Sequence, residues 1–114
     1  MMNSEGFQVA PAELEGLLLG HSDILDACVI GVEDRDNATE LPLAFIVLKP
    51  GLPRDETKEK EIIDWLSKQT APYKKLRGGV RFVDEIPKSP AGKLLRRVLR
   101  DQVQQEQRKG GAKL

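Results

Sequence analysis

A lysine near the carboxyl end of the sequence is the residue best placed to do chemistry. Lys93 follows a stretch that contains Pro87, Pro90 and Gly92, and it precedes a run of apolar residues at helical spacing. The unpaired backbone amides at a helix start already attract an anion, so a cation there gains nothing from the helix itself. A cation is favoured there when a negatively charged molecule docks beside it. Lys93 is therefore the first functional candidate.

The residues around Lys93 predict a stiff loop followed by an amphipathic helix. Pro87 and Pro90 fix φ and lack amide donors, whereas Gly92 permits a turn that a side chain would hinder. The apolar residues of the predicted helix are Leu94, Leu95, Val98, Leu99 and Val103. Taken alone, this local pattern is equally compatible with a solvated surface lysine.

The Gly-Lys pair does not belong to a nucleotide-binding P-loop. That motif requires a glycine five residues before the pair and a serine or threonine directly after it. The sequence has Pro87 and Leu94 at these two positions. The loop is thus not predicted to cradle phosphates with its backbone.

Size and composition limit the function further. The chain has 114 residues, which is one small domain, and no apolar run approaches the roughly 20 residues of a membrane span. We therefore expect no membrane span, and no N-terminal signal pattern is recognisable. The single cysteine, Cys28, lies in an apolar run, so we expect a buried, inert thiol and no disulfide framework.

Charge is segregated along the chain although the net charge is zero. Residues 1–56 carry 11 acidic and 3 basic side chains, and residues 57–114 carry 7 acidic and 15 basic ones. The basic half is suited to polyanions. Trp65, Tyr73 and Phe82 are too few and too scattered for a base-stacking platform, so no nucleic-acid partner is expected. A nucleotide with phosphates, such as ATP or coenzyme A, fits a small basic patch at least as well.

Apolar periodicity predicts three helices and three strands that would hold Lys93 in place. In chain order these are a helix from Pro11 to about Gly20, strands at 24–32 and 41–48, a helix at 58–69, a strand at 80–83 and a helix after Lys93. This order predicts an α+β fold, a small mixed β-sheet covered by helices in a two-layer sandwich. We assign residues 1–107 to the domain and 108–114 to a flexible tail, and expect the chain to be mobile from Gln104 onward.

Two separated motifs resemble a known family. Residues 84–97, Asp-Glu-Ile-Pro-Lys-Ser-Pro-Ala-Gly-Lys-Leu-Leu-Arg-Arg, resemble the last core motif of the adenylate-forming superfamily, which includes acyl-CoA synthetases, 4-coumarate-CoA ligases, beetle luciferases and the adenylation domains of peptide synthetases. Residues 75–87 and 6–15 resemble the coumarate-ligase and luciferase branch in particular. The resemblance implies the C-terminal lid domain of an AMP-forming acid-thiol ligase, which has an architecture of the predicted kind.

In that family a carboxylate first attacks the α-phosphate of ATP to form an acyl adenylate. Both reactants are anionic, and a lysine ammonium offsets their repulsion as charge develops. Lys93 matches the family's adenylation lysine, and Gly92 beside it belongs to the same implied binding loop. The resemblance implies that ATP and coenzyme A are substrates and that Mg²⁺ is held mainly by a large N-terminal domain. Without that domain, we expect this polypeptide to catalyse neither step at a useful rate.

A thiol then displaces AMP after the lid domain has rotated. The resemblance implies that Gly6 and Phe7 form the loop past which pantetheine reaches the reacting centre. Gln8 matches a position that contacts this centre in coumarate ligases, which makes it the second catalytic candidate; a surface amide before a helix is the alternative. Lys75, with Arg96 and Arg97, is a candidate for the coenzyme A phosphates, although solvated faces are the commoner fate of such residues. Asn3 replaces a lysine of the family, and a hinge residue is missing before Gly6, which leaves the linker and part of the thioester chemistry unassigned.

Other polar residues receive structural assignments. We expect Glu13 and Glu15 to be helix-start carboxylates and His21 to be a residue of the turn that follows the first helix. No residue is assigned to a metal site.

The sequence also leaves alternatives. The lid domain of a luciferase-like enzyme or of a fatty acyl-CoA synthetase is one, and a non-enzymatic module that binds polyanions or a partner protein is another. Ala112-Lys113-Leu114 resembles a type-1 peroxisomal signal, which implies an import receptor as partner and a peroxisomal location, with the cytoplasm as the alternative.

Overall fold

The computed structural model describes residues 11–34, 39–70 and 76–113. Three helices and three strands follow one another as α1 (Pro11–Leu18), β1 (Ile24–Asp34), β2 (Thr39–Leu48), α2 (Glu56–Ser67), β3 (Gly79–Phe82) and α3 (Arg96–Lys113). The predicted order of elements is confirmed, and the α+β class with a small mixed sheet is confirmed as well.

The sheet has the order β1-β2-β3 and is mixed. β1 and β2 are antiparallel, with a register that runs from Ile24 opposite Leu48 to Asp34 opposite Thr39. β2 and β3 are parallel, with Leu43 opposite Gly79 and Ile46 opposite Phe82. A parallel pair needs a crossover connection, and α2 provides it. β2 is thus the central strand, which explains its continuous apolar sequence.

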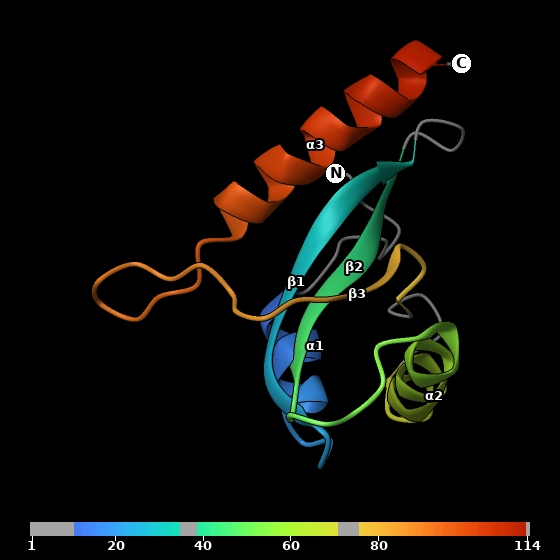
Figure 1. The fold of residues 1–114 in the computed structure, drawn as a ribbon, viewed down its shortest axis with the longest axis vertical. Coiled ribbons are helices and arrows are strands. Elements are labelled where there is room, and N and C mark those ends of the chain that lie inside the picture. The colour runs from blue at the N-terminus through green and yellow to red at the C-terminus, as the bar shows by residue number, and fades with distance from the viewer. Residues whose placement is uncertain (1–10, 35–38, 71–75, 114) are drawn as a thin grey trace.

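Helices cover both faces of this sheet, so the prediction of two layers is wrong and the fold has three. Ala27 and Val29 of β1 belong to a core cluster with α1 and α2, whereas Cys28 and Ile30 pack in a second cluster with Leu99 of α3. Successive residues of a strand point to opposite faces. Because β1 and β2 are apolar at consecutive positions, each face must be covered. In Figure 1, α3 lies beside the upper end of the β1–β2 ribbon, away from α1 and α2.

The last helix differs from the prediction at both ends. It begins at Arg96 and not directly after Lys93, because Leu94 forms a β-bridge with Lys88 and the Leu95 amide donates to the Pro87 carbonyl at 2.9 Å. At the other end α3 continues to Lys113, where a mobile tail from Gln104 was expected. Glutamine, glutamate, arginine and lysine, which fill 104–109, are favourable helix formers. The domain boundary at residue 107 stays a prediction.

No helix in the described ranges combines the length and the apolar character needed to cross a membrane.

Candidate functional site

The loop that carries Lys93 is held in shape by its own backbone. Lys88 and Leu94 pair in an antiparallel bridge, the Ser89 amide donates to the Lys93 carbonyl at 2.9 Å, and the Gly92 amide donates to the Ser89 carbonyl at 2.8 Å. The hydroxyl of Ser89 accepts from the Lys93 amide at 3.2 Å. In Figure 1 this loop is the orange segment that projects from the body of the domain between β3 and α3. We call this loop, residues 88–95, the arm, and its backbone hydrogen bonds make it a preformed structure.

Gly92 is required by the backbone of this arm. Its φ is +85°, a left-handed conformation that side chains disfavour, and a Cβ built there would meet no atom within 4 Å. The turn itself, and not crowding, thus explains the glycine. The cofactor-binding role implied for Gly92 stays a prediction.

The side chain of Lys93 is exposed, and its ammonium has no hydrogen bond or ion pair with any residue that the structure describes. This charge is therefore not neutralised within the described part of the domain. An exposed, unpaired ammonium on a projecting arm is available to an anion on a docked neighbour. An internal ion pair would have ruled out the role predicted for Lys93, and the described residues form none.

Ion pairs anchor the two ends of the arm to the body. At the first end, Lys88 Nζ lies 2.6 Å from Asp26 Oδ2 on β1. At the second end, the guanidinium of Arg96, the first residue of α3, makes two hydrogen bonds to the carboxylate of Glu15 on α1, the Nε bond being 3.1 Å long.

Glu15 and Arg96 differ from what the sequence suggested. Glu15 was expected to be a helix-start carboxylate, but only 6% of it is exposed and its Oε2 accepts from the Val29 amide at 2.7 Å. Arg96 was considered for coenzyme A phosphates or a solvated face, but it binds Glu15. One signal was available: Glu15 is three residues before Leu18, on the apolar side of α1, where a carboxylate requires a partner.

Several predicted site residues cannot be placed. Gly6, Phe7, Gln8 and Lys75 lie outside the described residues, so their roles stay predictions. Arg97 is described and exposed, and it has no ion pair with the described residues.

Arg97 lines a groove of about 690 Å³ between α3 and the end of the β1–β2 hairpin. Arg100 contributes a second positive charge, but Glu33, Glu40 and Asp101 line the same groove. Elsewhere the fold pairs bases of the second half of the chain with acids of the first half, as in Lys58–Asp23, Lys88–Asp26 and Arg96–Glu15. These pairs neutralise part of the basic half among the described residues, and the groove beside Arg97 and Arg100 carries both signs of charge, which weakens the case for a polyanion-binding module.

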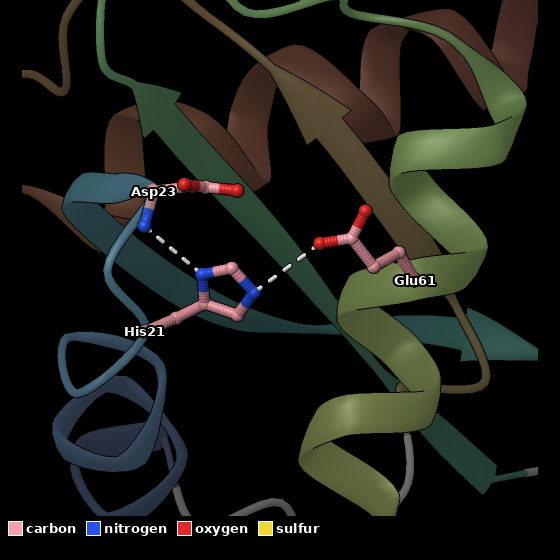
Figure 2. A group of neighbouring side chains, drawn as sticks. All are labelled: His21, Asp23 and Glu61. Carbon is pink, nitrogen blue, oxygen red and sulfur yellow. Dashed lines mark hydrogen bonds and ion pairs between the residues drawn. The ribbon is translucent and has the colours of Figure 1, made fainter.

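A second polar cluster contains His21, Asp23 and Glu61 (Figure 2). His21 lies in the turn after α1, as predicted, but it is buried. Its Nδ1 accepts a hydrogen bond from the Asp23 amide at 3.0 Å, and its Nε2 lies 3.7 Å from Glu61 Oε2. Its ring packs edge-on against Trp65, with 4.8 Å between the ring centroids. The three residues offer ligand atoms within 4.8 Å of one another, so a metal ion must be considered.

Lys58 argues against a metal in this cluster. Its buried ammonium lies 3.0 Å from Asp23 Oδ2 and 3.1 Å from Glu61 Oε1, so it already neutralises the carboxylates that a cation would need. The Nδ1 of His21 is also engaged by a backbone amide. The cluster therefore acts as a brace that ties the turn after α1 to α2.

This brace predicts an acid-sensitive contribution to stability. The hydrogen bond from Lys58, with its charge and that of Lys49, lowers the pKa of Asp23 below its usual value, and the same bond raises the pKa of Lys58. A carboxyl whose folded pKa is lowered binds fewer protons in the folded state, so its contribution is present above the unfolded pKa and is lost as pH falls through the folded pKa. The free energy of unfolding, measured with urea, is expected to fall between pH 7 and pH 2. In the Lys58→Met variant this fall in unfolding free energy should be much smaller, and an equally large fall would contradict the brace.

Cys28 is fully buried, as expected, and carries no disulfide. Desolvation, with a smaller contribution from the charge of Glu15, raises the pKa of its thiol to about 11. The thiolate is the reactive form, so Cys28 is inert near neutral pH.

Comparison with known proteins places this geometry in context. Residues 13–93 match the family model of the AMP-binding enzyme C-terminal domain. The chain is 50% identical over 99 residues to the 4-coumarate-CoA ligase-like 8 protein of Arabidopsis thaliana, which covers 87% of the chain and 17% of that protein. It is 47% identical over 114 residues to luciferin 4-monooxygenase of Photinus pyralis, which covers 100% of the chain and 20% of the relative. The chain thus spans about one fifth of the length of these relatives.

Solved structures share the fold. The acyl-CoA synthetase of Brucella canis superimposes with a TM-score of 0.79 at 34% identity, over 85% of this chain and 18% of that one. ATP-bound MatB from Rhodopseudomonas palustris superimposes with a TM-score of 0.74 at 31% identity, over 85% and 18% of the two chains.

Proposed function

The chain belongs to the AMP-binding enzyme C-terminal domain family, and on that premise we propose that it is the mobile lid domain of an ATP-dependent acyl- or aryl-CoA ligase of the 4-coumarate-CoA ligase kind. The observation that carries the proposal is the exposed ammonium of Lys93, unpaired within the described residues, on a preformed arm. The likeness to 4-coumarate-CoA ligases and acyl-CoA synthetases supports it.

In the first step a carboxylate oxygen of the acid attacks the α-phosphate of ATP, and pyrophosphate leaves. Lys93 approaches from the lid and places its positive charge beside the two anionic groups as they meet. A preorganised positive charge of this kind lowers the barrier because its attraction for the reactants becomes stronger as negative charge develops in the transition state. Lysine suits the position because its ammonium is a compact charge on a long, flexible stem.

Magnesium belongs to the large domain in this proposal. The described residues offer one group of three candidate ligands, the cluster of His21, Asp23 and Glu61, and its carboxylates are bound to Lys58. A magnesium ion would be held with ATP in the large domain, where it would neutralise phosphate charge, and the lid would contribute the ammonium of Lys93.

In the second step the lid rotates, Lys93 withdraws, and the loop of Gly6 and Phe7 faces the adenylate. The thiol of coenzyme A attacks the acyl carbon, and AMP leaves. We assign Gln8 to the reacting centre and Lys75 to a phosphate of coenzyme A. The assignments of Gly6, Phe7, Gln8 and Lys75 rest on the family resemblance of residues 6–15 and 75–87, because all four lie outside the described residues.

A chimera tests the function of the domain. Residues 1–114 replace the matching C-terminal fifth of a 4-coumarate-CoA ligase, and coumaroyl-CoA formation is compared with that of the truncated ligase. We expect the chimera to regain activity that the truncated enzyme lacks. A folded chimera with no more activity than the truncated enzyme would contradict the proposal.

The nature of the acid is left to the large domain. Identities of 50% to a coumarate-ligase-like protein, 47% to a luciferin 4-monooxygenase and 45% to an acyl-coenzyme A synthetase of Emericella nidulans are too similar to separate these branches. A luciferase-like or fatty acyl-CoA synthetase lid therefore stays the alternative, and sequence from the large domain decides between them.

We also propose a peroxisomal location, based on Ala112-Lys113-Leu114 at the carboxyl terminus. A fluorescent protein fused ahead of the chain, so that Leu114 stays terminal, is expected to enter peroxisomes. Removal of the three residues should make it diffuse in the cytoplasm. A diffuse signal from the intact fusion would favour the cytoplasmic alternative.

A further inference from the structure

The attachment of α3 to α1 lies close to Lys93 in the chain. Arg96 is three residues after Lys93 and is the first residue of α3, and its guanidinium binds a carboxylate that comes 81 residues earlier. Two hydrogen bonds in a fork fix direction as well as distance. The helix start that follows the arm is therefore tied to one point of the body.

That point, Glu15, is buried and bound to the sheet. Glu15 is 6% exposed, and the oxygen that accepts from Arg96 Nε also accepts from the backbone amide of Val29 on β1. The sheet and the arginine thus hold the same carboxylate. Arg96 is 32% exposed, so the pair lies at the edge of the core and not on the open surface.

The other end of the arm has a weaker anchor. The side chains of Lys88 and Asp26 are 43% and 25% exposed, so water and salt screen this pair more strongly. The arm keeps its own shape through the bridge between Lys88 and Leu94. Its orientation relative to the rest of the domain depends on these two ion pairs and on the packing of Leu94 and the neighbouring Ile86 on the second core cluster; of the two ion pairs, Glu15–Arg96 is the less exposed.

We propose that Glu15 and Arg96 are positioning residues for adenylation: their ion pair sets the place from which Lys93 reaches the docked reactants. This inference rests on the proposed function of Lys93. A displacement of about 1 Å from a productive geometry costs up to about 100-fold in rate. Loss of the pair should therefore lower adenylate formation while the thioester step, in which Lys93 is withdrawn, changes little.

The test uses the chimera with the 4-coumarate-CoA ligase. Adenylation is followed by coumarate-dependent exchange of pyrophosphate into ATP, and the second step by transfer from preformed coumaroyl adenylate to coenzyme A. Arg96→Met is expected to lower exchange by about 10- to 100-fold and transfer by less than about 3-fold. Arg100→Met is the matched control, because it removes the same charge from an exposed position of α3 that has no ion pair with the described residues, and it should leave both rates unchanged.

A double-mutant cycle separates positioning from a general loss of structure. If Arg96 acts through Lys93, Arg96→Met has no further effect on exchange in the Lys93→Ala background. An equal loss of exchange in both backgrounds, or no loss in either, overturns the inference. If Arg96→Met lowers both steps because the domain unfolds, Arg96→Lys is used in its place, since lysine keeps the positive charge but cannot form the two-pronged hydrogen bond. A selective loss of pyrophosphate exchange in Arg96→Lys supports the positioning role. Unchanged exchange overturns it.

The same measurements distinguish a failure of the function proposed for Lys93 from a failure of the positioning role. If Lys93→Ala alone leaves exchange at the level of the parent chimera, the assignment of Lys93 fails. If Lys93→Ala lowers exchange strongly and Arg96→Met and Arg96→Lys do not lower it, the assignment of Lys93 stands and the positioning role is wrong.

Discussion

Replacing Lys93 by alanine is expected to lower adenylate formation by about 100- to 1,000-fold, the loss typical of one preorganised charge contact or hydrogen bond in a transition state. The structure gives the reason: the ammonium is exposed and unpaired within the described residues, so nothing in that part of the domain competes for it. Pyrophosphate exchange in the chimera measures the effect. Transfer from preformed adenylate to coenzyme A should change by only a few fold, because the lysine is withdrawn in that step.

Lys93→Arg is the matched control for charge. Arginine keeps the positive charge but spreads it over a rigid planar fork, so exchange should recover only in part. An alanine variant that keeps the parent rate of exchange, or that loses both half-reactions equally, would contradict the assignment.

Glu15→Ala is expected to destabilise the domain by about 3 kcal/mol, near the lower limit for breaking a buried ion pair because Arg96 is partly exposed. The substitution leaves the Val29 amide without its acceptor and the Arg96 guanidinium without its partner. Each of these groups was desolvated on folding, and neither regains full hydration in the variant.

Urea unfolding of the chain and of two variants measures this effect. Glu15→Gln is the matched control, because its amide oxygen can still accept from Val29 while the charge is lost, so it should cost less than Glu15→Ala. An alanine variant within about 0.5 kcal/mol of the parent would be typical of an exposed surface position, and would show that Glu15 is not the anchor that the structure indicates.

The elements of this fold follow from local patterns, whereas its anchors do not. Leu14 and Leu18 repeat at helical spacing, and Val29 and Ala44 lie in apolar runs of strand length, so helices and strands were identified from neighbours in the chain. The bond between Glu15 and Arg96 spans 81 residues. No local pattern indicates which of 18 acids meets which of 18 bases, and the pairing becomes defined only when α1 and α3 pack on opposite faces of the sheet.

The start of α3 illustrates the same limit near the site. Leu94 and Leu95 continue the apolar spacing of the helix, and the sequence therefore placed them in it. Their backbone groups instead close the arm, through the bridge to Lys88 and the bond to the Pro87 carbonyl. The presence of a stiff loop with an exposed lysine was predictable from two prolines and a glycine, but its closure by a bridge between residues 88 and 94 was not.

Chemical restoration of the charge at position 93 tests the central claim most directly. In the Lys93→Cys chimera, 2-bromoethylamine attaches an aminoethyl group to the exposed thiol and recreates an ammonium of nearly the same reach, while Cys28 is protected by burial and by a pKa of about 11. Lys93→Ala treated in the same way reports any effect of the reagent on other cysteines, and iodoacetamide adds a neutral group of similar size. We predict that aminoethylation restores most of the lost pyrophosphate exchange and that the neutral group restores none. Equal exchange after the two treatments would show that a positive charge at this position is not what adenylation requires.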